Sequence, residues 1–218
     1  MNLKNDSLDK HDDWYKKAVG GLWQEIGKLQ YDFMIKQGLM PEHFFLDVGC
    51  GSLRGGIHFI NYLQPGHYFG IDKNIDLLNA GKNIELIKNN LFQKNPHLLH
   101  VENFDFSIIH HSFHYALAQS VFTHLDVSDI AKCIQNIEKI LVQGGKFYAT
   151  FFENKSDVQS IEHLSLDGIH FSTFYDKDPY HYNFETFTKL CKETKLSVMY
   201  LGDWSHPRNQ QMMVFIKN

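Results

Sequence analysis

The sequence is poor in the features that mark secreted, metal-stabilised or membrane proteins. Its 218 residues include three cysteines, Cys50, Cys133 and Cys191, and no two of them form a C-x-x-C pair. A disulfide framework or a structural zinc site is therefore disfavoured, and a reducing, cytoplasmic location is expected. The first residues, Met1–Asp13, are polar and charged, and no apolar run approaches the roughly 20 residues of a membrane span. Neither export nor membrane insertion is indicated.

The chain also carries little net charge. Its formal net charge is −4, so it has no general attraction to phosphate backbones, and no nucleic-acid partner is expected. Hydrophobic residues make up 43%, which is enough for one well-buried core, whereas 218 residues are few for two ordinary domains. We expect a single domain over residues 1–218 that acts on a small molecule, with no membrane partner and with a homodimer as one possible assembly.

The most informative segment is an apolar run that ends on an acid and then breaks into glycines. Phe44–Val48 has the pattern of a buried strand, Gly49–Gly56 follows it, and Ile57–Leu63 is apolar enough to be a packed helix. Glycines let the backbone turn sharply beside a ligand, and the start of a helix offers unpaired N–H donors. A second apolar run, His67–Ile71, ends at Asp72, where a doubly wound sheet binds ribose hydroxyls. The pattern predicts a nucleoside site.

Two features argue against a nicotinamide dinucleotide as that nucleoside. The fingerprint G-x-G-x-x-G requires a third glycine where Arg54 follows Gly49 and Gly51. In addition, Asp47 would repel a pyrophosphate, whereas it would attract a cation. S-adenosylmethionine (SAM) carries a ribose, an ammonium and a sulfonium but no phosphate, so it suits two acids at neighbouring strand ends.

At this motif the chain resembles the class I SAM-dependent methyltransferases, whose first motif is D/E-x-G-x-G with an acid at the end of the second strand. Leu53 stands where that motif usually has its third glycine. The resemblance implies a cofactor site formed by the motif residues and their neighbours, Asp47, Gly49, Cys50, Gly51, Arg54, Asp72 and Lys73.

Strands and helices alternate along the chain, as is typical of a parallel sheet covered on both faces. The periodicity predicts helices at Ala18–Lys36, Ile75–Asn90, Val127–Val142 and Asn183–Glu193, and further strands at Leu98–Val101, Tyr115–Val121 and Lys146–Phe152. Ser197–Leu201 and Gln211–Ile216 must form an antiparallel pair, because the turn between them is too short for a parallel crossover. With the resemblance, this predicts a Rossmann-like, doubly wound α/β sheet of seven strands, six parallel and one reversed at the end.

Two segments lie outside this alternation. Residues 1–40, which include Trp23, are expected to form an N-terminal helical cap. Glu153–Tyr182 spans about thirty residues without a clear period, and segments of this length are usually functional or disordered. Its many aromatic residues argue against disorder, so we interpret it as an insertion that covers the substrate. The alternative is a surface extension packed on the edge of the sheet.

Two further clusters follow predicted strands. In the resembled family an acid and an apolar residue after the third strand hold the adenine, which implies these roles for Asp105 and Phe106. Asn103 and Phe104 are an alternative pair, and a further alternative is an Asx turn that only caps the next segment. The tip of the predicted fourth strand matches the position of the family's fourth motif, which implies that it faces the methyl group and that Gln119 lines the cofactor.

Histidines are the candidate catalytic bases, because imidazole accepts a proton near neutral pH. We single out His124, after the fourth strand, and His181, in the insertion; a capping or packing role is the alternative for His124. The cluster His110, His111 and His114 matches no ligand spacing, and no metal is assigned. Substrate-binding candidates are Tyr180 and three residues of the turn between the last two strands, Trp204, His206 and Arg208. Arg208 suits a carboxylate or phosphate; the alternative is that Trp204 and Pro207 pack under the terminal hairpin and Arg208 caps it.

Methyl transfer is an in-line displacement that needs alignment, exclusion of water and at most one base. The sequence therefore predicts a SAM-dependent methyltransferase of a small, sugar-like or natural-product-like acceptor, with oxygen as the expected methylated atom. That oxygen could belong to a hydroxyl, a carboxylate or a phosphate. An N-methyltransferase of a small amine, a non-catalytic SAM-binding subunit and an NAD-dependent oxidoreductase are the alternatives.

Overall fold

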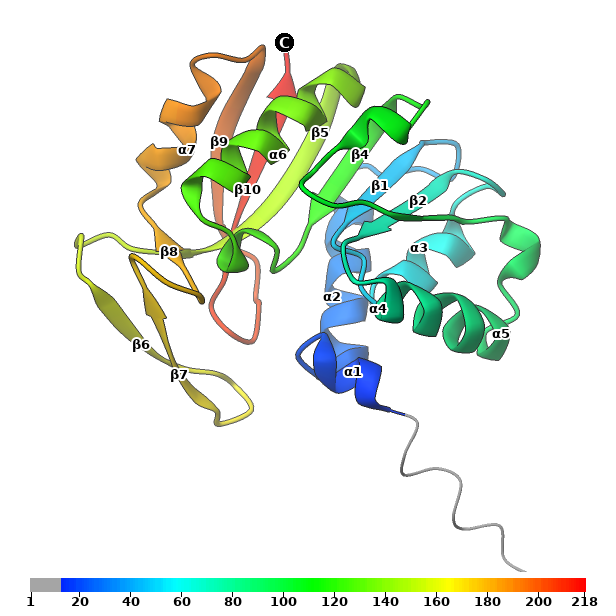
Figure 1. Ribbon diagram of the computed structural model, residues 1–218, viewed down its shortest axis with the longest axis horizontal. Coiled ribbons are helices and arrows are strands. Elements are labelled where there is room, and N and C mark those ends of the chain that lie inside the picture. Colours follow the sequence, from blue (N-terminus) through cyan, green and yellow to red (C-terminus); the bar gives the residue numbers. More distant parts are fainter. Residues whose placement is uncertain (1–12) are drawn as a thin grey trace, which may run out of the picture.

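An eight-stranded sheet forms the centre of the computed structural model, which describes residues 13–218 (Figure 1). Seven strands lie in the order β3-β2-β1-β4-β5-β10-β9, and the two-residue strand β8 (His181–Tyr182) pairs with β5 beside them. The seven strands are β1 (Phe45–Val48), β2 (Tyr68–Asp72), β3 (His97–His100), β4 (Phe113–Ala118), β5 (Leu141–Glu153), β9 (Leu196–Asp203) and β10 (Gln211–Lys217). Pairing is parallel from β3 to β5, and β10 runs antiparallel to both β5 and β9. Six of these seven strands thus share one direction and one is reversed, which confirms the predicted doubly wound α/β fold.

Helices cover both faces of the sheet because successive strand residues point to opposite sides. Leu46 and Ala149 belong to a core that includes α6 (Val127–Ile140) and α7 (Phe184–Cys191). Their neighbours Phe45 and Tyr148 belong to a second core that includes α2 (Trp23–Lys36), α3 (Gly56–Tyr62), α4 (Ile75–Ala80) and α5 (Leu86–Lys88). No helix within residues 13–218 is long and apolar enough to cross a membrane.

The expected helix Ala18–Lys36 is interrupted, which corrects the sequence-based assignment. α1 (Trp14–Ala18) ends where that helix was to begin, and α2 starts at Trp23. Gly20 and Gly21 between them have φ of +87° and +64°, in the left-handed region that glycine adopts without a steric penalty. The apolar spacing indicated the helix correctly but did not account for this glycine pair. Residues 1–12 of the expected N-terminal cap lie outside the described residues.

Capping side chains mark where helices α6 and α7 begin. Asp126 accepts a hydrogen bond from the backbone N–H of Asp129 at the start of α6, and Asn183 accepts one from Glu185 at the start of α7. The expected helix Val127–Val142 ends at Ile140, and the next residues already belong to β5. The expected helix Ile75–Asn90 consists of α4, a π-helical turn at Gly81–Glu85, and α5.

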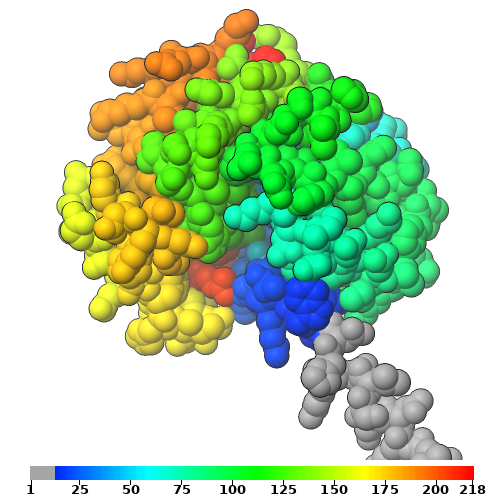
Figure 2. Space-filling model, in the orientation of Figure 1, coloured from blue at the N-terminus to red at the C-terminus, as the bar shows by residue number. Residues whose placement is uncertain are grey.

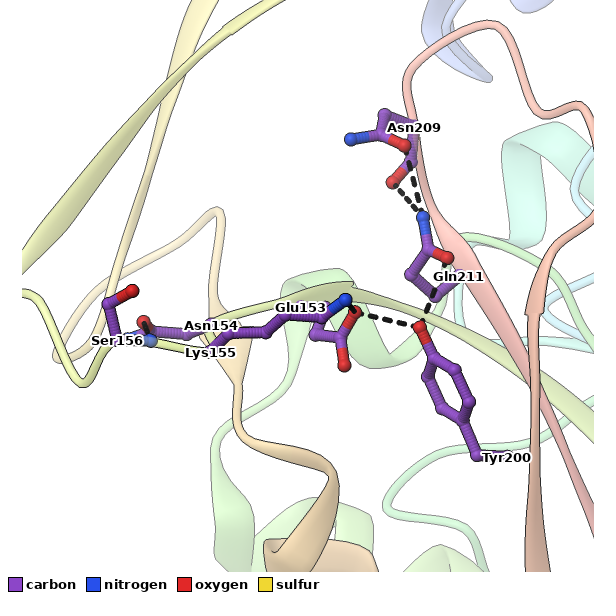
Figure 3. Close-up of polar contacts among 7 residues, drawn as sticks. All are labelled: Glu153, Asn154, Lys155, Ser156, Tyr200, Asn209 and Gln211. Atoms are coloured by element: carbon purple, nitrogen blue, oxygen red, sulfur yellow. Dashed lines mark hydrogen bonds and ion pairs between the residues drawn. The ribbon is translucent and has the colours of Figure 1, made fainter.

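The insertion between β5 and α7 is a β-hairpin and not an irregular loop. β6 (Ser160–Leu164) pairs antiparallel with β7 (His170–Phe174) outside the main sheet, and β8 (His181–Tyr182) returns alongside β5 (Figure 1). Side-chain contacts fasten the point where the insertion leaves the sheet. The Tyr200 hydroxyl donates to Glu153 Oε2 at 2.7 Å, and Lys155 Nζ lies 3.2 Å from the same oxygen (Figure 3). The insertion therefore projects from a fixed base at the carboxyl edge of the sheet.

Candidate active site

A cavity of about 790 Å³ opens at the carboxyl ends of the parallel strands. Its walls come from the strand tips, the loop between α1 and α2, the hairpin and the loop between β9 and β10. Figure 2 shows the surface hollowed between the N-terminal helices in blue, the hairpin in yellow to orange and the strand tips in green. This is the edge where ligands of open α/β sheets bind.

The glycine loop after β1 closes the floor of the cavity. Gly49 and Gly51 have φ of +71° and +53°. A Cβ on Gly49 would lie 2.6 Å from Val121 Cγ2, and one on Gly51 would lie 2.7 Å from Val19 Cγ1, so neither position accommodates a side chain. The Gly51 N–H donates to Asp72 Oδ2 at 2.8 Å, which joins the tips of β1 and β2. The loop is thus held open for a ligand that lies against bare backbone.

Asp47 is a buried carboxylate in this floor, with 4% of its surface exposed. Burial and, to a smaller extent, the nearby Asp72 raise the pKa of Asp47 to about 7, against the opposing effect of a 2.8 Å hydrogen bond from the Tyr68 hydroxyl. A ligand cation beside Asp47 would favour its ionised form. The site therefore fits the ammonium and sulfonium of SAM and disfavours a pyrophosphate.

The residues after β3 reach the cavity in a register different from the first expectation. Phe106 lines the cavity, as do Asn103 and Phe104, the alternative pair. The structure does not bring Asp105 there: its Oδ1 accepts from the Ser107 N–H at 3.0 Å and caps the short turn Phe106–Ile108. Asn103 and Phe104 have φ of +52° and +56°, and this left-handed backbone conformation could not be read from the sequence pattern.

A buried amide network fixes the tip of β4. Gln119 Oε1 accepts from Arg54 Nη2 at 2.7 Å and from Gln30 Nε2 at 3.1 Å, and Gln119 Nε2 donates to Ser120 Oγ. Ser120 Oγ in turn donates to Gln210 Oε1 at 3.0 Å. All five side chains line the cavity. Because each amide is already oriented by its neighbours, the polar floor is set before a ligand binds.

At the mouth of the cavity, His124 meets a partner that the sequence did not suggest. His124 Nδ1 lies 2.6 Å from Asp178 Oδ1, and both residues line the cavity. Asp178 is 54 residues away in the insertion, which returns to the strand tips through a 2.7 Å hydrogen bond from the Tyr180 N–H to the Thr123 carbonyl. No local motif marks this pairing, because it exists only when the insertion folds back.

Several candidate residues lie behind the walls and not in the cavity lining. His181 is 1% exposed and lies between Thr173 Oγ1 at 2.9 Å and the Val158 carbonyl at 3.1 Å. Trp204 donates from Nε1 to the Gln210 carbonyl and packs against Phe33. These contacts support the walls.

The other candidates divide between the walls and the cavity. Tyr180 stacks on Tyr182, and His206 is buried behind Gln119. Lys73 and Arg208 do line the cavity, as does Cys50. Sequence reasoning missed Lys17, Gln30, Phe152, Phe171, Asp178 and Gln210, which also line it. Only the aromatic content of the insertion pointed toward Phe171. Within residues 13–218, no group of three His, Cys, Asp or Glu side chains is arranged to hold a metal ion.

Comparison with known proteins agrees with this geometry. Residues 46–147 match the family described as "Methyltransferase domain". The whole chain is similar to magnesium protoporphyrin IX methyltransferase from Synechocystis PCC 6803, with a TM-score of 0.64, 10% identity and 86% of that chain covered. It is also similar over its whole length to the sugar N-methyltransferase KedS8 from Streptoalloteichus sp ATCC 53650, with a TM-score of 0.66, 14% identity and 97% coverage.

A third structure, a SAM-dependent methyltransferase from Clostridium acetobutylicum ATCC 824, has a TM-score of 0.63 and 14% identity, with 93% of this chain and 95% of that chain covered. The fold is that of these methyltransferase structures. The matched segment, residues 46–147, contains the glycine loop after β1 and the acids Asp47 and Asp72, and together the comparisons support a SAM-dependent methyltransferase.

Proposed function

We propose that this enzyme methylates a hydroxyl group of a small polar acceptor and that His124 is its general base. The observation that carries the proposal is the 2.6 Å contact of His124 Nδ1 with Asp178 Oδ1 at the mouth of the cavity. An ionised carboxylate can only accept a hydrogen bond, so Nδ1 must carry the proton and Nε2 is left with a free lone pair. Nε2 is then the atom that would take the hydroxyl proton.

The residues of the cavity have separate roles in this reaction. When bound, SAM supplies an electrophilic methyl group on its sulfonium. The acceptor oxygen forms the new bond to that carbon as the carbon–sulfur bond breaks, and the hydroxyl proton moves to His124 Nε2. Asp178 stabilises the resulting imidazolium and holds the ring in orientation, while Phe152 of β5 and Phe171 of the hairpin exclude water.

The size of the cavity supports a small acceptor. Ligand pockets of about 300–1,000 Å³ typically enclose one drug-sized molecule, and this one of about 790 Å³ must hold the cofactor as well. The acceptor side combines the amide floor at Gln119 and Gln210 with aromatic residues of the hairpin wall. We infer an acceptor with several polar groups and at least one apolar face, and a lid function for Glu153–Tyr182.

The test is to identify an acceptor with isotope-labelled SAM and mass spectrometry, and then to measure His124→Ala and Asp178→Asn. Loss of a general base lowers turnover by about 10²-fold or more, so His124→Ala should lower kcat to that extent while Kd for S-adenosylhomocysteine (SAH) stays unchanged. Asp178→Asn should lower kcat less and should flatten its rise with pH. If His124→Ala kept the kcat of the wild type, His124 would not be the general base.

A small amine is the second candidate acceptor, because a sugar N-methyltransferase is similar over the full length of the chain. Fragmentation of the labelled product separates an O-methyl from an N-methyl group directly. A protein that binds SAH but transfers no label to carbohydrate, amino-acid or phenolic pools would favour the non-catalytic subunit.

A further inference from the structure

The protein has two arginines in 218 residues, Arg54 and Arg208, and they meet at the same cavity. Arg54 comes from the glycine loop before α3, and Arg208 comes from the loop between β9 and β10. Within residues 13–218 neither guanidinium lies within 4.0 Å of a carboxylate, since the ion pairs there all involve lysine or histidine. Two positive groups therefore border the cavity, and neither forms an ion pair with another described residue.

Both guanidinium groups are held by carbonyls of one short loop. Arg54 Nη1 donates to the carbonyls of Val19 at 2.6 Å and Gly21 at 3.0 Å. Arg208 Nη2 donates to the carbonyl of Gly20, between them, at 2.5 Å. A Cβ on Gly20 would lie 2.8 Å from Arg208 Nη1, so the absence of a side chain there makes room for the guanidinium. The loop thus orients the two cations side by side.

One donor of this pair is buried and unpaired. Arg54 is 7% exposed, and its Nε has no hydrogen-bond partner. Natural structures rarely leave such a donor unsatisfied, and a ligand oxygen is a common explanation. Burial and the positive charge of Arg208 lower the pKa of Arg54 to about 10, so it remains charged at neutral pH.

No carboxylate of residues 13–218 forms an ion pair with these charges, although Asp167 in the turn of the hairpin interacts with Arg208 electrostatically. Burial, Arg54 and Arg208 together lower the pKa of His206 to about 3, so the imidazole beside them is neutral. Asp47 also interacts with Arg54, at the cofactor end of the cavity. Arg208 lies at the other end, near the insertion, where the Leu166 N–H donates to the Pro207 carbonyl at 2.9 Å. The positive charge therefore extends from the floor toward the hairpin wall.

We propose that the acceptor is an anion whose carboxylate or phosphate group binds between Arg54 and Arg208, while its hydroxyl lies toward His124. Arginine is suited to this role because its planar donors match an oxyanion in pairs. The placement of the hydroxyl rests on the proposed function, whereas binding of the anion does not. A small hydroxy acid or a sugar phosphate has the required combination of groups.

The experiment uses three small alcohols that differ in charge: glycerol, glycerate and glycerol 3-phosphate. Each is titrated by calorimetry into the SAH complex of the wild type, Arg208→Gln, Arg54→Gln and the control Lys17→Gln, at constant ionic strength. Lys17 lines the same cavity, so the control removes one positive charge without touching the arginine pair. We expect the wild type to bind at least one anion at least tenfold more tightly than glycerol. Arg208→Gln should abolish this preference and Lys17→Gln should keep it.

The two anions separate a carboxylate acceptor from a phosphate acceptor. No preference for either anion in the wild type would overturn the proposal, as would a preference that survives in Arg208→Gln. Arginine variants that weaken SAH binding and leave the anion preference intact would assign both arginines to the cofactor. Arg208 is partly exposed, so its variant remains informative if Arg54→Gln does not fold. His124→Ala should bind the anions like the wild type, which separates this result from that of the proposed base.

Discussion

The two ends of the cavity are built from different parts of the chain. At the cofactor end, Asp47, Gly49 and Gly51 are adjacent in sequence, and Asp72 joins them at the tip of the neighbouring strand. At the end proposed to bind the acceptor, His124 pairs with Asp178, and Arg208 of the loop between β9 and β10 approaches Arg54 of the glycine loop. The cofactor end is therefore a local motif on rigid strands, whereas the acceptor end depends on an insertion and a distant loop. Such an arrangement allows the acceptor to differ among enzymes that keep one cofactor.

Removal of the hairpin is the strongest test of this division. Residues 160–174 would be replaced by two glycines, which keeps Asp178 and the base of the insertion at Glu153. We expect turnover to be abolished, because the wall residue Phe171 is lost and water enters the cavity. Kd for SAH, measured by calorimetry, should change less than about threefold, since no strand tip is altered. Loss of folding would instead show that the hairpin is part of the core.

Two glycines with similar backbone angles, one at each end of the cavity, allow the effect of an added side chain to be compared. Gly49 has φ of +71° and its Cβ would clash with Val121, whereas Gly168 in the hairpin has φ of +80° and nothing within 4 Å. Gly168→Ala should therefore lower the free energy of unfolding only by the left-handed strain of about 1–2 kcal/mol. Gly49→Ala adds overpacking of about 1–3 kcal/mol and should weaken SAH binding more than tenfold. Equal effects in denaturant titrations would show that the clash is relieved without cost.

Asp72→Ala should have the next largest effect. Its carboxylate accepts from the Gly51 and Asn74 N–H groups and is expected to accept from the ribose hydroxyls. A hydrogen bond to a charged group contributes about 1.5–3 kcal/mol, so affinity for SAH should fall about tenfold to a hundredfold. Calorimetry checks this, with Asp178→Ala as the acceptor-end control that should leave SAH affinity unchanged. An unaltered Kd in Asp72→Ala would place the ribose elsewhere.

The smallest expected effect is a difference in pH dependence between the two ends. His206 has a pKa lowered to about 3, so between that value and about pH 6.5 the unfolded chain binds the extra proton and acid destabilises the fold. Asp47 has a pKa raised to about 7, so between about pH 4 and 7 the folded chain binds the extra proton and acid stabilises it. Each slope is about 1.4 kcal/mol per pH unit, and the two oppose each other between about pH 4 and 6.5.

Substitution of either residue should therefore leave the pH dependence of the other one unopposed. The free energy of unfolding of Asp47→Asn without ligand should fall more steeply than that of the wild type as the pH drops from 6.5 to 4.5. Over the same drop in pH, the free energy of unfolding of His206→Gln should fall less steeply than that of the wild type, or should rise. Denaturant titrations at three pH values measure both, and comparison with the wild type cancels the remaining histidines. Slopes identical to that of the wild type would mean that these groups titrate alike in the folded and unfolded chain.

Periodicity and capping residues were sufficient to predict most of the fold. The alternation of apolar runs indicated the strands and helices, and the short final turn required a reversed strand, because neither depends on distant contacts. The pattern failed at Gly20 and Gly21, where left-handed backbone ends a helix whose apolar spacing continues. It also missed the hairpin of residues 160–174, whose strands alternate without a fully buried face.

For the site, the sequence by itself determined what local chemistry can determine. Asp47, Gly49, Gly51 and Asp72 could be expected to lie at one cavity because strand tips and tight turns are recognisable within a few residues of sequence. Only the tertiary structure decided that Asp178 reaches His124, that the two arginines converge, and that His181 and Trp204 support walls. Those outcomes depend on how distant segments pack at one edge of the sheet. Packing is a property of the whole fold, and it cannot be inferred from the spacing of residues along the chain.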